Sequence, residues 1–197
     1  RLPRYYRNIC ELKAEGAQRI SSRALAERMG LTASQIRQDF NCFGGFGQQG
    51  YGYNVSNLTG EIKRIMGIDR KHTIIIVGAG NIGHALTNFP GFAETGFEVK
   101  ALFDVNEDLI GTEIKGHPVL DVKDMDEYIR ENQIDIGVIA ARRSAAQEIA
   151  DRMCAAGIRG IWNFVPLDIT TSVPIENVHL SESLSTLSYK IEHGLLD

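Results

Sequence analysis

The sequence has no apolar run long enough to cross a bilayer. None of its hydrophobic stretches approaches the roughly 18 residues that a transmembrane helix needs, and no secretory leader is visible. Cysteine is scarce, because Cys10, Cys42 and Cys154 lie far apart, form no CxxC pair and are odd in number. These absences exclude a membrane-spanning chain and a disulfide framework. We therefore expect small buried thiols and a reducing, cytoplasmic setting.

Motifs for catalysis are also missing. The five histidines, at positions 72, 84, 117, 179 and 193, form no HxxxH, HExxH or acid-paired pattern. No GxSxG occurs, and no Cys/His arrangement stands out. The sequence therefore predicts no catalytic residue and no metal site.

Charge is divided unevenly along the chain. Residues 1–70 carry 11 Lys and Arg against 6 Asp and Glu, a net charge of +5, whereas residues 71–197 carry 10 against 19, a net charge of −9. The two sums give the overall −4. A basic first third before an acidic remainder indicates two functions in one chain, with the basic part facing a polyanion.

The first third is predicted to begin with three helices. Residues 3–16 have helical spacing of apolar side chains, and Ser21 or Ser22 can cap a second helix that ends at Gly30. Thr32 and Gln35 form a capping-box pattern that opens a third helix to about Phe43. Two short helices joined by a turn at Gly30 have the form of a helix-turn-helix.

A glycine-rich segment follows these helices. Five glycines between Gly44 and Gly52 alternate with Phe46, Tyr51 and Tyr53. Glycine allows the positive φ values of tight hairpins, and aromatic residues favour short strands. We predict the hairpin wing of a winged helix, with a flexible glycine linker as the alternative. A last helix over 57–67 and a joint at 68–72 complete a domain at residues 1–70.

From Thr73 onward the pattern alternates between strands and helices, which predicts a doubly wound parallel sheet. We expect strands at 73–77, 98–103, 135–140 and 159–164, and helices at 81–89, 121–131 and 143–156. The fold class is therefore α/β, with a nucleotide-binding domain at 73–180. Residues 181–193 have an apolar stripe typical of an amphipathic helix, and we assign 181–197 to a C-terminal helical segment.

The loop that follows the first of these strands carries the motif Gly78-Ala79-Gly80-Asn81-Ile82-Gly83. Gly78 permits a tight turn, Gly80 lets the backbone approach a pyrophosphate, and Gly83 lets the helix pack closely on the strand. The helix N-terminus then offers N–H groups to the phosphates. The motif predicts a Rossmann-type dinucleotide site.

Asp104 ends the second predicted strand, 21 residues after Gly83. A carboxylate at this place accepts hydrogen bonds from the hydroxyls of the adenosine ribose. Val105 and Asn106 follow it without an adjacent arginine, so NAD is favoured over NADP. Since no catalytic group accompanies the site, the pattern favours a protein that senses the nucleotide and is not an enzyme.

The third helix is the candidate for reading DNA. Arg37 can read guanine in the major groove, while Ser34, Gln35, Gln38 and Asn41 can contact bases or phosphates. The wing tip at Gln48 and Gln49 can enter the minor groove, and Tyr51 beside it is a further DNA-binding candidate. Candidates for contacts to the DNA backbone are Arg4, Arg7, Arg19, Arg23 and Arg28.

Over nearly its whole length the chain resembles the Rex family of redox-sensing transcriptional repressors. The matching stretches are RLPRYYR (1–7), ISSRALAERMGLTASQIRQDF (20–40), FGGFGQQGYGYNV (43–55), VGAGNIGHAL (77–86), NFPGF (88–92), FDVN (103–106), AAGIRGIWNFVP (155–166) and ENVHLSESLSTLSY (176–189).

The resemblance implies a homodimer that exchanges a C-terminal helix and binds palindromic, AT-rich operator DNA. It further implies that the protein leaves DNA when NADH rises relative to NAD⁺, without consuming either nucleotide. The implied cofactor-binding residues are Gly78, Ala79, Gly80, Asn81, Ile82, Gly83, Phe89, Asp104, Val105, Ala141, Asn163, Phe164, Val165 and Pro166. Apolar walls such as Phe89, Val165 and Pro166 would favour NADH, because the oxidised nicotinamide carries a charge that is costly to desolvate.

Several positions depart from the family's pattern. Gln38 and Gln49 stand where a basic residue is common, and His179 replaces an acidic residue that pairs with the arginine aligned with Arg7. AARR at 140–143 replaces Thr-Val-Pro, and Phe89 replaces a tyrosine. The alternative to a repressor is a small NAD-dependent oxidoreductase, or a CoA- or nucleotide-binding enzyme, with a helical appendage.

Overall fold

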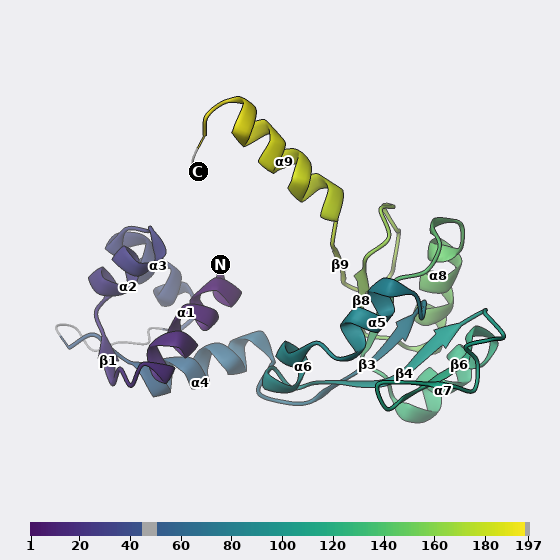
Figure 1. Cartoon of the computed structure of the whole chain (residues 1–197). Coiled ribbons are helices and arrows are strands. Elements are labelled where there is room, and N and C mark those ends of the chain that lie inside the picture. The colour runs from purple at the N-terminus through teal and green to yellow at the C-terminus, as the bar shows by residue number, and fades with distance from the viewer. Residues whose placement is uncertain (45–50, 196–197) are drawn as a thin grey trace. The chain divides into compact units, whose positions relative to one another are not determined.

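The chain divides into two compact units, Arg1–Arg70 and Lys71–Asp197 (Figure 1). The structure is a computed structural model that describes residues 1–44 and 51–195, apart from the side chains of residues 93 and 94. Each unit has its own hydrophobic core. Each is therefore described by itself.

The described residues of the first unit form four helices: α1 (Leu2–Ala14), α2 (Ser22–Met29), α3 (Ala33–Cys42) and α4 (Val55–Met66). The expected start and stop signals of α2 are confirmed. The Ser21 side chain accepts a hydrogen bond from the Ala24 N–H, and Gly30 ends the helix in the left-handed region at φ 66°. The capping box at Thr32 and Gln35 is also present. The predicted helix-turn-helix is therefore formed by α2 and α3.

Aromatic residues hold the core of this unit together. The Phe40 ring makes edge-on contacts with Tyr5, at 5.1 Å between ring centroids, and with Tyr53, at 5.0 Å. Tyr5 and Phe40 are almost fully buried. Such pairs fix side-chain geometry as well as burying area, so α3 is held against α1 and the segment after the wing.

The predicted wing is described only in part. Residues 45–50, with Gln48 and Gln49, lie outside the described residues. Beyond them, β2 (Tyr53–Asn54) pairs antiparallel with β1 (Arg19–Ile20). The strand at Arg19–Ile20 was not predicted, because two residues are too few to display a period of two.

The second unit is built on a seven-stranded sheet in the order β5-β6-β4-β3-β7-β8-β9. All neighbouring pairs are parallel except β5 with β6. The strands are β3 (His72–Val77), β4 (Phe97–Asp104), β5 (Glu113–Ile114), β6 (His117–Asp121), β7 (Ile136–Ile139), β8 (Gly160–Asn163) and β9 (Ile175–Asn177). The four strands predicted from sequence form its centre.

Alternate residues of the central strand enter two different cores. Ile75 and Val77 pack against α7 (Met125–Asn132) and α8 (Ala146–Ala156), whereas Ile74 and Ile76 belong to the cluster that includes Leu86 of α5 (Asn81–Thr87). Short 3₁₀ turns, η1 (Val122–Asp124) and η2 (Arg143–Ala145), precede α7 and α8. A sheet buried on both faces explains the continuous β-branched run at 73–77.

Two helices remain. The first, α6 (Pro90–Glu94), was not predicted as a separate helix, because proline at its start and only five residues leave no helical periodicity to recognise. The second, α9 (Leu180–Glu192), confirms the predicted C-terminal helix, and none of its residues is buried. Among the described residues, no helix is both long and apolar enough to cross a membrane.

Candidate functional sites

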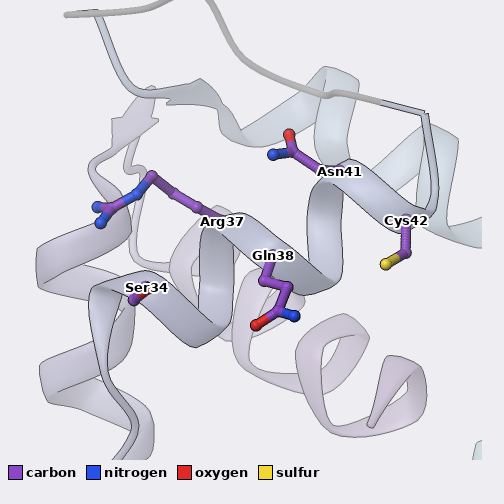
Figure 2. Close-up of a pocket in the computed structure, with 5 residues that line it drawn as sticks. All are labelled: Ser34, Arg37, Gln38, Asn41 and Cys42. Carbon is purple, nitrogen blue, oxygen red and sulfur yellow. The ribbon is translucent and has the colours of Figure 1, made fainter.

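The exposed face of α3 gathers most of the residues predicted to read DNA. Ser34, Arg37, Gln38 and Asn41 are all exposed and line one shallow pocket together with Cys42 (Figure 2). Their spacing of three and four residues places them on one side of the helix. Arginine, glutamine and asparagine offer the donors and acceptors that base edges in the major groove require.

The opposite side of α3 fixes which residues face outward. Ile36 and Phe40 are buried in the core of the unit, with exposures of 0% and 1%. The helix therefore cannot roll about its axis without exposing these side chains. Packing of the buried side thus determines which face of α3, with its predicted DNA-reading residues, is exposed.

Gln35 is placed differently from its neighbours. Its Oε1 accepts hydrogen bonds from the Thr32 N–H at 3.0 Å and from the Thr32 hydroxyl at 3.1 Å, so this oxygen caps the helix. Gln35 is also half-buried. The geometry gives it a structural role, which leaves Arg37 and Gln38 as better candidates for base contact.

Cys42 extends the same exposed face and was not proposed from sequence. Its position on this face was predictable from sequence, because Cys42 lies one helical turn beyond Gln38. The three cysteines are free, and the expectation of buried thiols is wrong for Cys42, which is exposed. Cys10 and Cys154 are intermediate.

The arginines proposed to contact the DNA backbone differ in whether they already form ion pairs or hydrogen bonds within the unit. Arg28 pairs with Glu15 at 2.7 Å and Glu11 at 3.1 Å, so its charge is neutralised within the unit. Arg4 donates to the Met29 carbonyl at 2.6 Å and thereby caps the end of α2.

The remaining arginines of this set are more accessible. Arg23 pairs with Glu27 through exposed side chains, and Arg7 is exposed. Arg19 donates to the Tyr51 carbonyl and lies over the Tyr51 ring, while Tyr51 itself is 71% exposed. Arg19 and Tyr51 therefore form a cationic and aromatic pair beside the segment predicted as the wing.

In the second unit, the glycine loop has the close contacts that its motif requires. Gly78 follows β3 with φ 107°, and a Cβ built there would lie 2.4 Å from the Ala140 carbonyl oxygen. A Cβ at Gly83 would lie 2.0 Å from the Gly78 carbonyl oxygen. Gly80 differs, because a Cβ there would meet no heavy atom within 4 Å. The space beside Gly80 is therefore open to a ligand.

Asp104 stands at the end of β4 and is bonded to this loop. Its Oδ2 accepts from the Ala79 N–H at 2.6 Å, while its Oδ1 accepts from the N–H groups of Val105 and Asn106 at 2.8 and 2.9 Å. The carboxylate thus joins the end of β4 to the glycine turn. Val105 is 68% exposed, and Asn81 and Ile82 at the start of α5 are also exposed.

Two of the predicted cofactor residues lie inside the protein. Asn163 is 0% exposed, and its amide donates to Val165, Leu167 and Asn177 while accepting from the Val165 N–H. Val165 is 4% exposed in the core beneath α8. Both shape the loop after β8, and neither side chain faces an open site in this structure.

The proposed nicotinamide wall is not assembled as predicted. Phe89 lies against Phe92 at 5.3 Å, in a largely apolar groove over the first residues of β7, β8 and β9. Pro166 is exposed beyond the opposite, carboxyl end of β8. Phe164 packs on Trp162 at 4.5 Å, and Ala141 is half-buried beside the glycine loop.

The described residues contain no group of three or more His, Cys, Asp or Glu side chains that could hold a metal ion. The site in the second unit consists instead of backbone amides, one carboxylate and open space. This arrangement can bind phosphates and a ribose.

Two family models match the chain. Residues 1–41 match a family described as a putative DNA-binding protein N-terminus, and residues 69–167 match the CoA binding domain. The second match includes the glycine loop and Asp104.

Curated relatives match both units together. The chain is 51% identical over 196 residues to the redox-sensing transcriptional repressor Rex of Clostridioides difficile, covering 98% of this chain and 93% of the relative. It is 50% identical over 193 residues to the Rex protein of Thermoanaerobacter sp., covering 97% and 86%.

Solved structures agree in fold. The chain matches a crystal structure of RSP in complex with β-NAD⁺ and operator DNA with a TM-score of 0.95 and 49% identity, covering 100% of this chain and 91% of that one. It matches RSP in complex with β-NADH with a TM-score of 0.90 and 46% identity, covering 100% and 93%.

Proposed function

The chain belongs to the Rex family of redox-sensing transcriptional repressors, and we propose that it represses transcription by binding operator DNA and releasing it when NADH binds. It is a regulator and not an enzyme. One observation carries the proposal. The chain is 51% identical to a Rex repressor over a single alignment that includes both the DNA-reading helix α3 and the glycine loop.

The first unit, residues 1–70, is the winged-helix DNA-binding domain of this proposal. The outward face of α3 reads an AT-rich palindrome in the major groove, with Arg37 as its only charged donor among the four predicted residues there. A palindrome presents two half-sites, so a homodimer reads it with two copies of α3 in successive grooves.

Residues 73–180 are the NAD(H)-binding domain, and the segment 181–197, which begins within α9, is the part through which two copies associate. The nucleotide binds over the carboxyl ends of the strands, with its pyrophosphate at Gly80 and its adenosine ribose at Asp104. NADH and NAD⁺ are sensed there and not consumed. The proposal requires the cytoplasm, where operator DNA and free nicotinamide nucleotides occur together.

Redox sensing then follows from a difference in affinity between two conformations. A ligand can shift an equilibrium only as far as it prefers one state over the other. To lower operator affinity about 100-fold, NADH must favour the DNA-free form by about 2.7 kcal/mol.

A gel-shift titration tests the proposal. A labelled AT-rich palindrome is held at fixed NAD⁺ while NADH rises from zero to saturation, with a scrambled duplex as the control. We expect the palindrome to be bound first and then released, and CoA serves as a comparison ligand because of the family match. Operator binding that stays constant across the NADH titration would contradict the proposal.

A further inference from the structure

Two arginines follow β7 at the edge of the sheet where the glycine loop lies. The residue pairs of the parallel strands place Val77, Ile139 and Asn163 in one row, so the segments after β3, β7 and β8 leave the sheet together. Arg142 and Arg143 belong to the segment after β7. That segment touches the glycine loop, because the Ala140 carbonyl oxygen closes the space beside Gly78.

The charges of these arginines are not used within the described part of the second unit. Two other arginines of this unit are paired, Arg152 with Asp126 and Arg159 with Asp135. Arg142 and Arg143 are exposed, and neither forms an ion pair with any residue that the structure describes. They therefore present two free positive charges in a region whose net charge is −9.

The glycine loop supplies no positive side chain of its own. Residues 78–83 contain neither lysine nor arginine, and the nearest bonded ionisable group is the carboxylate of Asp104. A pyrophosphate at this loop would meet backbone amides on one side and a negative charge close by. Amides alone bind phosphate through a partial charge at the helix N-terminus, so a neighbouring cation has a clear role.

We propose that Arg142 and Arg143 form a cationic clamp on the pyrophosphate of the bound dinucleotide. The inference rests on the proposed function, in which NAD(H) occupies this loop. Guanidinium groups suit phosphate oxygens, because they donate two parallel hydrogen bonds and remain charged at all relevant pH values.

A clamp on the pyrophosphate raises the affinity for the dinucleotide without changing the preference between NADH and NAD⁺. NADH and NAD⁺ carry the same pyrophosphate and differ only in the nicotinamide ring. A cation on the pyrophosphate therefore strengthens binding of both forms by the same factor. A cation beside the ring would instead favour NADH, because the oxidised ring is positive. The strand order supports a position at the pyrophosphate. The strand β7, which the arginines follow, lies directly beside β3, which the glycine loop follows.

The test compares the double variant Arg142→Gln/Arg143→Gln with the matched variant Lys71→Gln/Arg130→Gln, which removes two exposed charges from the same unit at other positions. Titration calorimetry measures NADH, NAD⁺ and ADP-ribose, which has the pyrophosphate but no nicotinamide. We expect all three affinities to fall about tenfold in the clamp variant and less than about twofold in the matched variant. High salt should reduce the difference, because the affected charges are exposed.

The outcomes separate the clamp from the function on which it rests. A clamp variant that binds all three ligands as tightly as the unmodified chain overturns the clamp and leaves the repressor proposal intact. A change in the ratio of NADH to NAD⁺ affinity, with ADP-ribose unaffected, also overturns it by placing the arginines at the ring. An unmodified chain that binds none of the three ligands overturns both.

Discussion

Arg37 is the residue of the first unit whose side chain we expect to matter most to DNA recognition. It is exposed at the centre of the reading face, and its Nη1 lies 3.3 Å from the Ser22 hydroxyl of α2. We expect Arg37→Ala to weaken operator binding by about 2 kcal/mol, because a bidentate contact to a base is lost. A gel shift with the palindrome measures the change.

The control for Arg37 is Arg64→Ala, which removes an exposed arginine of α4 that pairs with Glu61. This change should leave operator affinity within about twofold, since surface positions outside the interface contribute little. Equal losses in the two variants would mean that Arg37 acts only through the overall charge of the unit.

The buried hydroxyl of Tyr5 stabilises the first unit through Asp39. It donates to Asp39 Oδ2 at 2.6 Å, and this hydrogen bond, aided by Arg1, holds the pKa of the Asp39 carboxyl below its usual range. Burial and the same bond raise the pKa of Tyr5. We expect Tyr5→Phe to cost about 1.5 kcal/mol of unfolding free energy at pH 7.

The pH dependence of this loss has a definite sign. Because the pKa of Asp39 is lowered by folding, its contribution is complete above the usual aspartate pKa of about 4 and is lost as the pH falls through the lower folded value. The stability gap between Tyr5→Phe and the unmodified chain should therefore shrink below about pH 4 in denaturant titrations. A gap that is constant down to pH 2.5 would assign it to packing alone.

Residue identity and spacing predicted which residues share the exposed face of α3, but not the hydrogen bonds that each side chain makes. Ser34, Arg37, Gln38 and Asn41 follow from helical periodicity alone. The predicted cofactor residue Asn163 ends β8 with its side chain buried and bonded to the loop that follows, and the sequence alone does not show that burial. The family resemblance also does not show whether the Asn163 side chain is buried.

At the scale of elements, the glycine loop makes a prediction that separates folding from binding. Gly83→Ala brings a Cβ within 2.0 Å of a backbone oxygen and should destabilise the second unit by about 2 kcal/mol. Gly80→Ala meets open space and should cost only about 0.5 kcal/mol, as a poorer helix cap. Thermal unfolding of the two variants measures these costs.

For NADH binding, in contrast to stability, we expect a large effect of Gly80→Ala. In Gly80→Ala the added methyl occupies the space that the pyrophosphate needs, so NADH affinity should fall at least about tenfold in a well-folded protein. Gly60→Ala, in α4 of the other unit with open space around it, is the matched control and should bind NADH normally. Tight NADH binding by Gly80→Ala would show that the nucleotide lies elsewhere.

The elements themselves were predictable in proportion to their length. The long helices and the four central strands follow from periodicity and from runs of β-branched residues. The edge strands β5 and β9, the strand β6 beside β5 and the short helix α6 were missed, because two to five residues carry little periodicity and pairing across the sheet determines the strands. The register of the sheet needed the three-dimensional structure.

At the scale of the whole molecule, the two units are separate in core and in charge. One cluster of buried residues lies within residues 1–70, and two others lie within the sheet unit. The basic charge belongs to the unit with the reading helix and the acidic charge to the unit with the glycine loop. We expect a change at the predicted nucleotide site to reach DNA through the joint at 68–72 or through association of two chains.

The helix α9 makes association the stronger route. Leu184, Leu187 and Ile191 lie on one side of it and are 68%, 53% and 72% exposed. An apolar stripe of this kind is costly in water and is typical of a surface that another chain covers. We expect Leu184→Asp/Leu187→Asp to convert a dimer into a monomer in analytical ultracentrifugation.

The same variant tests whether dimerisation matters for repression. A monomer contacts one half-site, so operator affinity should fall at least about 100-fold, while NADH affinity falls far less, because the glycine loop lies within one chain. Ser185→Asp changes the polar side of α9 and should leave both the dimer and the operator complex unchanged. A double variant that stays dimeric would show that α9 does not form the interface. A monomer that keeps full operator affinity would show that repression does not need two half-sites.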